Sequence, residues 1–174
     1  YYVWLKLSAF RNDIENPIFQ QSTGDPSFTV VNKLKQRRQG LEMEVRTLPV
    51  YHTSVIAGAA IIDAKDSDTG VRLAAIPTRI YDLGLRYDDE QSLRALLKGR
   101  YIDLNAEPSD IPDLQSAYGS FIFDLNVIKK LYQRKNSTLE AFGTAHNIFN
   151  GNQYQFADFK NPTRWFEGGL RYTF

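Results

Sequence analysis

The chain has 174 residues, which is enough for one domain with a substantial core. Its formal net charge of +1 provides no strong field for nucleic acid or for an acidic partner. It contains no cysteine, which excludes disulfides, thiolate nucleophiles and cysteine-ligated zinc.

Period-two alternation of apolar and polar residues, interrupted by turn residues, dominates the sequence and indicates antiparallel strands. It predicts eight strand segments, at about 1–12, 28–48, 53–64, 75–88, 91–104, 119–132, 137–149 and 163–174. The best helical candidate is 90–98, but Leu93, Ala95 and Leu97 alternate with Arg94 and Lys98 there, which favours a strand. The expected fold class is therefore all-β.

The predicted connections alternate strictly between short and long along the chain. Three are short, at 48–52, 88–91 and 133–136, and four are long, at roughly 13–27, 64–75, 105–118 and 150–162. Outer-membrane barrels have short periplasmic turns and longer extracellular loops, so this order is typical of them. The longest apolar run, 55–62, falls far short of the roughly 18 residues of a transmembrane helix.

The alternation also separates two chemically different faces. In the last segment Phe166, Leu170 and Tyr172 share one face, while Glu167 and Arg171 share the other. The segment at 53–64 is apolar on both faces between Val55 and Ile62 and cannot be oriented. Alternation alone fits a water-soluble sheet with its apolar side inward, and equally a barrel wall with its apolar side toward lipid.

The C-terminus favours the membrane alternative. The alternation stops on a terminal aromatic residue, and Leu170, Tyr172 and Phe174 resemble the assembly signal of outer-membrane barrels. Phe174 and Tyr172 are expected in the periplasmic aromatic girdle. Segment eight then runs toward the periplasm, which places the long loops outside and the short turns inside.

Three groups of residues stand in a fixed order along the chain. They are Asn32 with Arg38-Gln39-Gly40-Leu41-Glu42-Met43-Glu44; Gly70 with Ile76-Pro77 and Gly84-Leu85-Arg86-Tyr87; and His146-Asn147-Ile148-Phe149-Asn150 with Tyr154, Asn161-Pro162, Arg164 and the terminal Gly169-Leu170-Arg171-Tyr172-Thr173-Phe174. Their order and spacing resemble the last strands of TonB-dependent outer-membrane receptors.

This resemblance implies a transmembrane β-barrel of about 22 strands in the bacterial outer membrane, of which residues 1–174 are expected to form roughly the last eight. It also implies a plug domain in the lumen and a TonB protein that supplies energy for the uptake of a scarce ligand, such as siderophore-iron, cobalamin or haem. The plug and the TonB-binding segment are absent from this chain. Since 1–4 reads as the inside of a strand, the chain is expected to be the C-terminal portion of a longer protein.

Two groups of side chains are candidate contact sites. Tyr154, Phe156 and Phe159, in the last outer loop, suit a flat or aromatic ligand, although packing within the loop explains them equally. The second group lies on the outer part of the predicted exterior face, where lipopolysaccharide phosphates are natural partners, although ordinary edge charges have the same pattern. Its members are Lys33, Lys35, Arg37 and Arg164.

The sequence contains no nucleophile elbow, histidine metal pair or phosphate loop, so neither an enzyme nor a cofactor is expected. The acidic segment 63–70 has the spacing of a calcium loop but lacks its bidentate glutamate. Two alternatives to a transporter remain: a self-contained eight-stranded structural or adhesive outer-membrane protein, and a soluble β-barrel binding module. The sequence does not identify the ligand.

Overall fold

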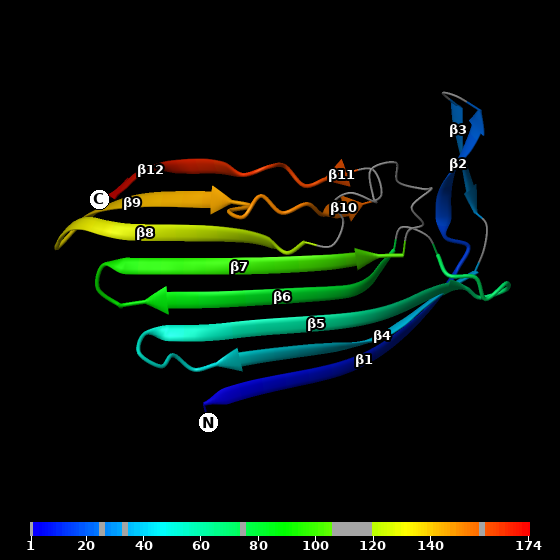
Figure 1. Ribbon diagram of the computed structural model, residues 1–174, viewed down its shortest axis with the longest axis horizontal. Coiled ribbons are helices and arrows are strands. Elements are labelled where there is room, and N and C mark those ends of the chain that lie inside the picture. Colours follow the sequence, from blue (N-terminus) through cyan, green and yellow to red (C-terminus); the bar gives the residue numbers. More distant parts are fainter. Residues whose placement is uncertain (1, 25–26, 33–34, 74–75, 106–119, 157–158) are drawn as a thin grey trace.

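The eight long strands form one antiparallel sheet in the computed structural model (Figure 1). The structure describes residues 2–24, 27–32, 35–73, 76–105, 120–156 and 159–174, with the side chains of 19–34 and 154–160 left out. The strands of the sheet, in their spatial order, are β1 (Val3–Glu15), β4 (Lys35–Thr47), β5 (Thr53–Asp66), β6 (Pro77–Asp88), β7 (Leu93–Leu104), β8 (Ile122–Arg134), β9 (Ser137–His146) and β12 (Trp165–Thr173). The predicted all-β class is confirmed.

Two short hairpins stand outside the main sheet. One pairs β2 (Ile18–Gly24) with β3 (Ser27–Asn32), and the other pairs β10 (Tyr154–Phe156) with β11 (Phe159–Lys160). The prediction of one continuous strand over 28–48 was therefore wrong. Its first part pairs backward with β2, and only the part from Lys35 onward joins the sheet beside β1.

The register between the strands shows which residues lie on each face of the sheet, and it gives the orientation of β5. Leu41 and Met43 lie opposite Ile61 and Ala59, so the odd-numbered residues of β5 from Val55 to Ile61 share the apolar face. The even-numbered residues of β5 lie on the polar face. Large apolar side chains remain exposed on the first face, and a contiguous patch of this kind marks a membrane or protein interface.

The two edges of the sheet are β1 and β12, and these strands are not paired with each other in the described part of the chain. Each other long strand has a hydrogen-bonded neighbour on both sides. Eight strands that closed on themselves would pair first with last. This sheet is instead an open section of wall. None of the described residues form a helix long and apolar enough to cross a membrane.

Aromatic rings cover glycines on neighbouring strands. A Cβ atom on Gly99 would lie 2.5 Å from Phe123 Cε1, and one on Gly169 would lie 2.8 Å from Phe142 Cζ. Both glycines stand directly opposite these phenylalanines in the register. The missing side chain therefore makes room for the ring, which shields the glycine backbone and fixes the strand pairing.

The short turn between β6 and β7, at the end of the sheet opposite the long loops, is stabilised by hydrogen bonds to an aspartate side chain. Asp89 Oδ1 accepts hydrogen bonds from the backbone N–H groups of Gln91, Ser92 and Leu93 at 2.9, 2.7 and 2.8 Å. These donors, that of Leu93 above all, hold the pKa of the Asp89 carboxyl well below its usual value. A turn that begins at an aspartate is expected from turn chemistry.

Candidate functional site

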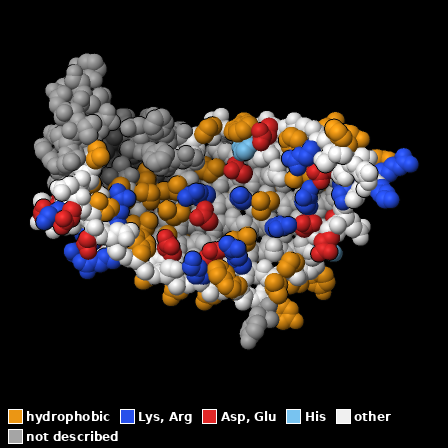
Figure 2. Space-filling model, turned by 180° about the vertical axis from the view of Figure 1, so that it is seen from behind, with side chains coloured by type: hydrophobic (Ala, Val, Ile, Leu, Met, Phe, Trp, Pro, Cys, Tyr) orange, Lys and Arg blue, Asp and Glu red, His pale blue; other side chains and the backbone are white. Residues whose placement is uncertain are grey.

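The polar face carries acidic and basic side chains intermixed across its whole width, as Figure 2 shows. The charged and polar side chains of β4, β6, β7, β8, β9 and β12 on this face share one parity of the register. They include Glu42, Glu44, Arg46, Asp82, Arg86, Arg94, Lys98, Arg100, Asp124, Asn126, Glu140, His146, Glu167 and Arg171. A face of this composition needs water or a polar partner over it.

Glu140 is the most enclosed acid on this face and bridges three strands. Arg94 Nη2 on β7 donates to Glu140 Oε1 at 2.6 Å, and Arg171 Nη1 on β12 lies 3.5 Å from Glu140 Oε2. The Glu140 side chain is only 13% exposed, so this ion pair is less screened than the others on the face. It links β7 to β9 across the intervening β8.

His146 lies at the opposite end of the face, beside the long loops. Its ring stacks on Trp165 with 3.8 Å between ring centroids and 12° between planes. Asp124 lies 3.7 Å from Nδ1, and Glu167 lies 3.4 Å from Nε2. Both ring nitrogens thus face carboxylates. Even so, no group of His, Asp and Glu among the described residues is arranged to hold a metal ion.

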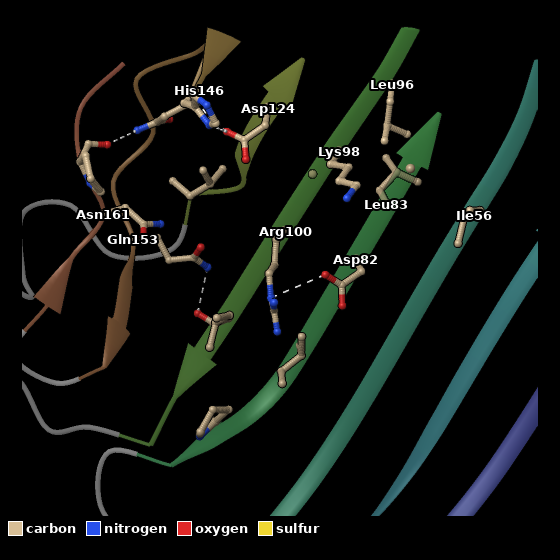
Figure 3. Close-up of a pocket in the computed structure, with 18 of the residues that line it drawn as sticks. Ile56, Asp82, Leu83, Leu96, Lys98, Arg100, Asp124, His146, Gln153 and Asn161 are labelled. Atoms are coloured by element: carbon tan, nitrogen blue, oxygen red, sulfur yellow. Dashed lines mark hydrogen bonds and ion pairs between the residues drawn. The ribbon is translucent and has the colours of Figure 1, made fainter. Parts of the chain in front are cut away.

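A cavity of about 850 Å³ opens on the polar face beside this histidine (Figure 3). Its walls come from β5 to β9 and from the segments that flank the β10–β11 hairpin. Arg100 and Asp82 form an ion pair at 3.6 Å on one side, and Gln153 and Asn161 line the other. Asn161 Oδ1 is shielded from solvent and has no hydrogen-bond partner within the described ranges. A donor from the occupant of the cavity would satisfy it.

Tyr154, Phe156 and Phe159, the aromatic residues predicted to bind ligand, belong to the β10–β11 hairpin. β10 contacts β7, whose Ile102 helps to line the cavity. The backbone therefore brings these residues toward the cavity end of the sheet, while their side chains lie outside the described set. Sequence reasoning did not identify Gln153 or Asn161 as cavity residues, although Asn161 belongs to the pattern that carries the family resemblance.

A belt of ion pairs crosses the apolar face at the end that carries the long loops. Arg37 Nε donates to Asp13 at 2.7 Å, and Arg11 Nε donates to the same carboxylate at 3.0 Å. The belt continues across β5 to β7 with Lys65–Asp63 at 2.8 Å and Arg79–Asp103 at 4.0 Å. These pairs stand directly beyond the apolar residues of the same strands.

The four predicted basic residues are not brought into one patch. Lys35 and Arg37 lie on β4, and Lys33 lies outside the described residues. Arg164 precedes β12 at the opposite edge of the sheet, where Nη1 donates to the Ile148 carbonyl at 3.3 Å. Arg11 and Lys65 are the nearer neighbours of Arg37, through the register of β1 and β5.

Comparison with known proteins identifies the architecture. A ferric-catecholate import receptor, Fiu from E. coli K12, matches with a TM-score of 0.64 and 19% identity over 99% of this chain and 25% of its own. The copper transporter OprC matches with a TM-score of 0.72 and 16% identity over 99% of this chain and 30% of its own. The FrpB iron transporter from Neisseria meningitidis matches with a TM-score of 0.67 and 15% identity over 99% and 28%. No curated relative matches.

An open antiparallel sheet with an apolar face and a charged face, matched by these structures over 99% of its length, has the fold of a section of an outer-membrane β-barrel wall. The family model described as TonB dependent receptor-like, beta-barrel, matches residues 2–148, and the chain belongs to this family. Its members are receptors and transporters of the bacterial outer membrane, and the predicted family is confirmed. The chain spans about a quarter to three-tenths of the structures it matches.

Proposed function

We propose that this chain forms the C-terminal part of the barrel of a TonB-dependent receptor that imports a scarce ligand, such as siderophore-iron, cobalamin or haem. The observation that carries the proposal is the charged face of an open sheet. The open edges need further strands to pair with, and the charged face needs a polar domain or water over it. The remaining barrel strands and a plug domain supply these, and TonB supplies the energy. Among the matched structures, two are named as iron or ferric-catecholate importers and one as a copper transporter.

The cavity supports binding without covalent chemistry. It combines isoleucine side chains with the Arg100–Asp82 pair and with the amide of Asn161. Ligand pockets of a few hundred to roughly 1,000 Å³ typically combine an apolar lining with a few polar groups that orient the ligand. The open sheet disfavours the self-contained eight-stranded barrel, because β1 and β12 do not pair within the described residues.

Uptake by cells that produce the complete receptor tests the proposal. Ferric enterobactin, haem, cyanocobalamin and copper(II) serve as radiolabelled probes, with and without a protonophore that removes the energy source. Uptake of one probe that requires both the receptor gene and the proton gradient is expected. Passive leakage of several probes, or an intact protein of about 20.0 kDa purified from membranes, would overturn the transporter assignment.

We further propose that the β10–β11 hairpin contributes ligand contacts through Tyr154, Phe156 and Phe159. The contact of β10 with β7 supports this, because it brings the hairpin backbone to the cavity wall. Alanine substitution of each aromatic residue is expected to raise the concentration for half-maximal uptake of the transported probe by roughly tenfold. Unchanged uptake in all three variants would instead assign these residues to packing within the loop.

The belt of ion pairs supports a second contact, with lipopolysaccharide. Lys35 and Arg37 stand on the apolar face beyond the apolar residues of β4, which is where basic side chains would meet lipid phosphates. Lys33 and Arg164 remain proposed members of this contact. The K35A/R37A variant is expected to purify with less lipid A phosphate than the parent, while R134A, at the other end of the sheet, is expected to retain it. Equal phosphate in all three proteins would contradict the contact.

A further inference from the structure

Two amide side chains are almost completely buried in the segment that joins β9 to β12. Asn147 is 3% exposed and Gln153 is 1% exposed. Outer loops of a barrel are normally solvated and change more readily than the wall. Buried amides in such a loop need hydrogen-bond partners, and the identity of those partners shows what the loop is attached to.

Asn147 joins the two ends of the loop and ties them to β8. Its Oδ1 accepts from the Gly151 N–H at 2.7 Å, and its Nδ2 donates to the carbonyls of Gly151 and Pro162, both at 2.9 Å. Its backbone N–H donates to Asp124 Oδ1 on β8 at 2.8 Å. The residue has φ 47°, in the left-handed region where asparagine is enriched. The side chain thus connects the start of the loop to its end, and the backbone N–H of the same residue ties both to the wall.

Gln153 makes the corresponding attachment to β7. Its Nε2 donates to the Ile102 carbonyl at 3.2 Å, across 51 residues of sequence. The Gln153 carbonyl in turn accepts from the Asn161 N–H at 2.8 Å, which holds the returning part of the loop. Figure 3 shows Gln153 and Asn161 side by side at the edge of the cavity, facing Arg100.

Gly151 packs directly against the chain that leads into β8. A Cβ atom there would lie 2.7 Å from the Phe121 carbonyl oxygen and 3.2 Å from Ser120 Cβ. Two backbone hydrogen bonds reinforce the approach: Ile148 N–H to the Phe123 carbonyl at 2.8 Å and Ser120 N–H to the Asn152 carbonyl at 3.3 Å. The loop ends are therefore bound to the wall as closely as neighbouring strands are.

We infer that residues 147–153 and 161–164 are a stationary lining of the barrel mouth, and that Asn147 is the positioning residue that seats them. The inference rests on the proposed transport function. For that function it means that the cavity wall formed by Gln153 and Asn161 does not move. Loop segments that close over a ligand need an open state of similar free energy. The bonds to β7 and β8 would all be lost together in such a state, and Asn147 and Gln153 would have to leave their buried positions before water could replace those bonds.

Hydrogen exchange of the complete receptor in detergent measures directly whether these two segments stay bound to the wall. Peptides covering 147–153 and 160–165 are expected to exchange as slowly as β8 and β9. In N147A their exchange is expected to accelerate roughly tenfold or more, with the strands unchanged. N136A, which removes an exposed amide in the β8–β9 turn, is the matched control and is expected to have no effect on these peptides. Fast exchange in the parent protein would overturn the inference whether or not a probe is transported.

A disulfide distinguishes a stationary lining from a closing loop. Cysteines at Ser120 and Gly151 would have Cβ atoms about 3.2 Å apart, and the chain contains no other cysteine. Because the new Cβ at Gly151 would also lie 2.7 Å from the Phe121 carbonyl oxygen, the reduced S120C/G151C protein is the control for the backbone shift that the substitution requires. The oxidised S120C/G151C protein is expected to retain uptake of the probe that the parent transports. Loss of uptake on oxidation, restored by reductant, would show that the loop must move and would overturn the inference.

Rescue separates positioning from general stability. N147A is expected to lower uptake of the transported probe by roughly tenfold, and the oxidised disulfide in the N147A background is expected to restore it. The reduced triple variant and the S120C single variant are the controls. Failure of the disulfide to restore uptake, with slow exchange regained, would show that Asn147 acts in another way. If the receptor transports none of the probes, the proposed function fails. The hydrogen-exchange result still decides whether residues 147–153 and 161–164 are held in place on the wall.

Discussion

At the residue scale, the sheet depends on pairs in which a ring fills the space left by a glycine. Phe123 over Gly99 lies on the apolar face, and Phe142 over Gly169 lies on the polar face. The same device therefore serves on both sides of the wall. A Cβ atom at such a glycine must push the ring out of its rotamer or separate the two strands.

Gly99→Ala is expected to destabilise the barrel by about 1–3 kcal/mol, because its Cβ would overlap the Phe123 ring. Gly143→Ala is the matched control on the same face, since its Cβ would meet nothing closer than the Glu167 carbonyl at 3.9 Å. Urea unfolding of the complete receptor in detergent measures both. Equal stability of the two variants would show that the Phe123 ring moves aside freely.

Asp89 makes a second residue-scale contribution, at the short turn between β6 and β7. Because its pKa is lowered by folding, its stabilising effect is complete above the unfolded pKa of about 3.9 and is lost as the pH falls toward the folded value. D89A is therefore expected to lower the urea midpoint at pH 7 and to differ less from the parent at pH 3. A difference independent of pH would show that the carboxylate charge has no part in the cap.

At the element scale, the bridge through Glu140 joins three strands that hairpin turns alone do not join. Glu140→Gln removes one charge and leaves Arg94 and Arg171 without their acid. The expected loss of stability is about 1–3 kcal/mol, because the bonded carboxylate is largely enclosed. Glu15→Gln, exposed at the far end of β1, is expected to change the urea midpoint little. Equal midpoints for the two variants would mean that solvent screens the bridge completely.

Sequence reasoning recovered the long strands because each one follows the period of the pleat over nine or more residues. It did not separate β3 from β4, although the apolar residues change from even positions at Phe28 and Val30 to odd positions at Leu41 and Met43. The pattern does not indicate which strand each part pairs with. It could not orient β5, since small and apolar residues occupy both parities. The register with Leu41 and Met43 supplied the missing information.

The cavity was the least predictable part. Its corner depends on Gln153, whose partner in β7 lies 51 residues earlier in the chain. Local sequence patterns do not indicate such a contact, and the segment was expected to be an outer loop in which only the aromatic residues were candidate ligand contacts. By contrast, the His146 to Asn150 motif was recognised from its residue types, and the structure explains the asparagine through the bonds that Asn147 makes to both ends of the loop.

At the scale of the whole molecule, β1 and β12 are the edges of the sheet, and they do not pair with each other within the residues that the structure describes. Exposed edges pair with other chains, and lipid tolerates no unsatisfied backbone groups. Residues 1–174 produced alone are therefore expected to aggregate in detergent during size-exclusion chromatography. A monodisperse, sheet-rich monomer would show that β1 and β12 can close on each other after all.

The order of strands has a consequence for the route by which this wall forms. Every long strand lies beside the next long strand in the sequence, and within the part of the chain that the structure describes the strands between partners are those of the β2–β3 and β10–β11 hairpins. Each pairing therefore closes a short stretch of chain at a small cost in loop entropy. The sheet can grow by one hairpin at a time from any correctly paired neighbours. If two strands first pair in a shifted register, only the pairing of the strands that are added after them need be delayed.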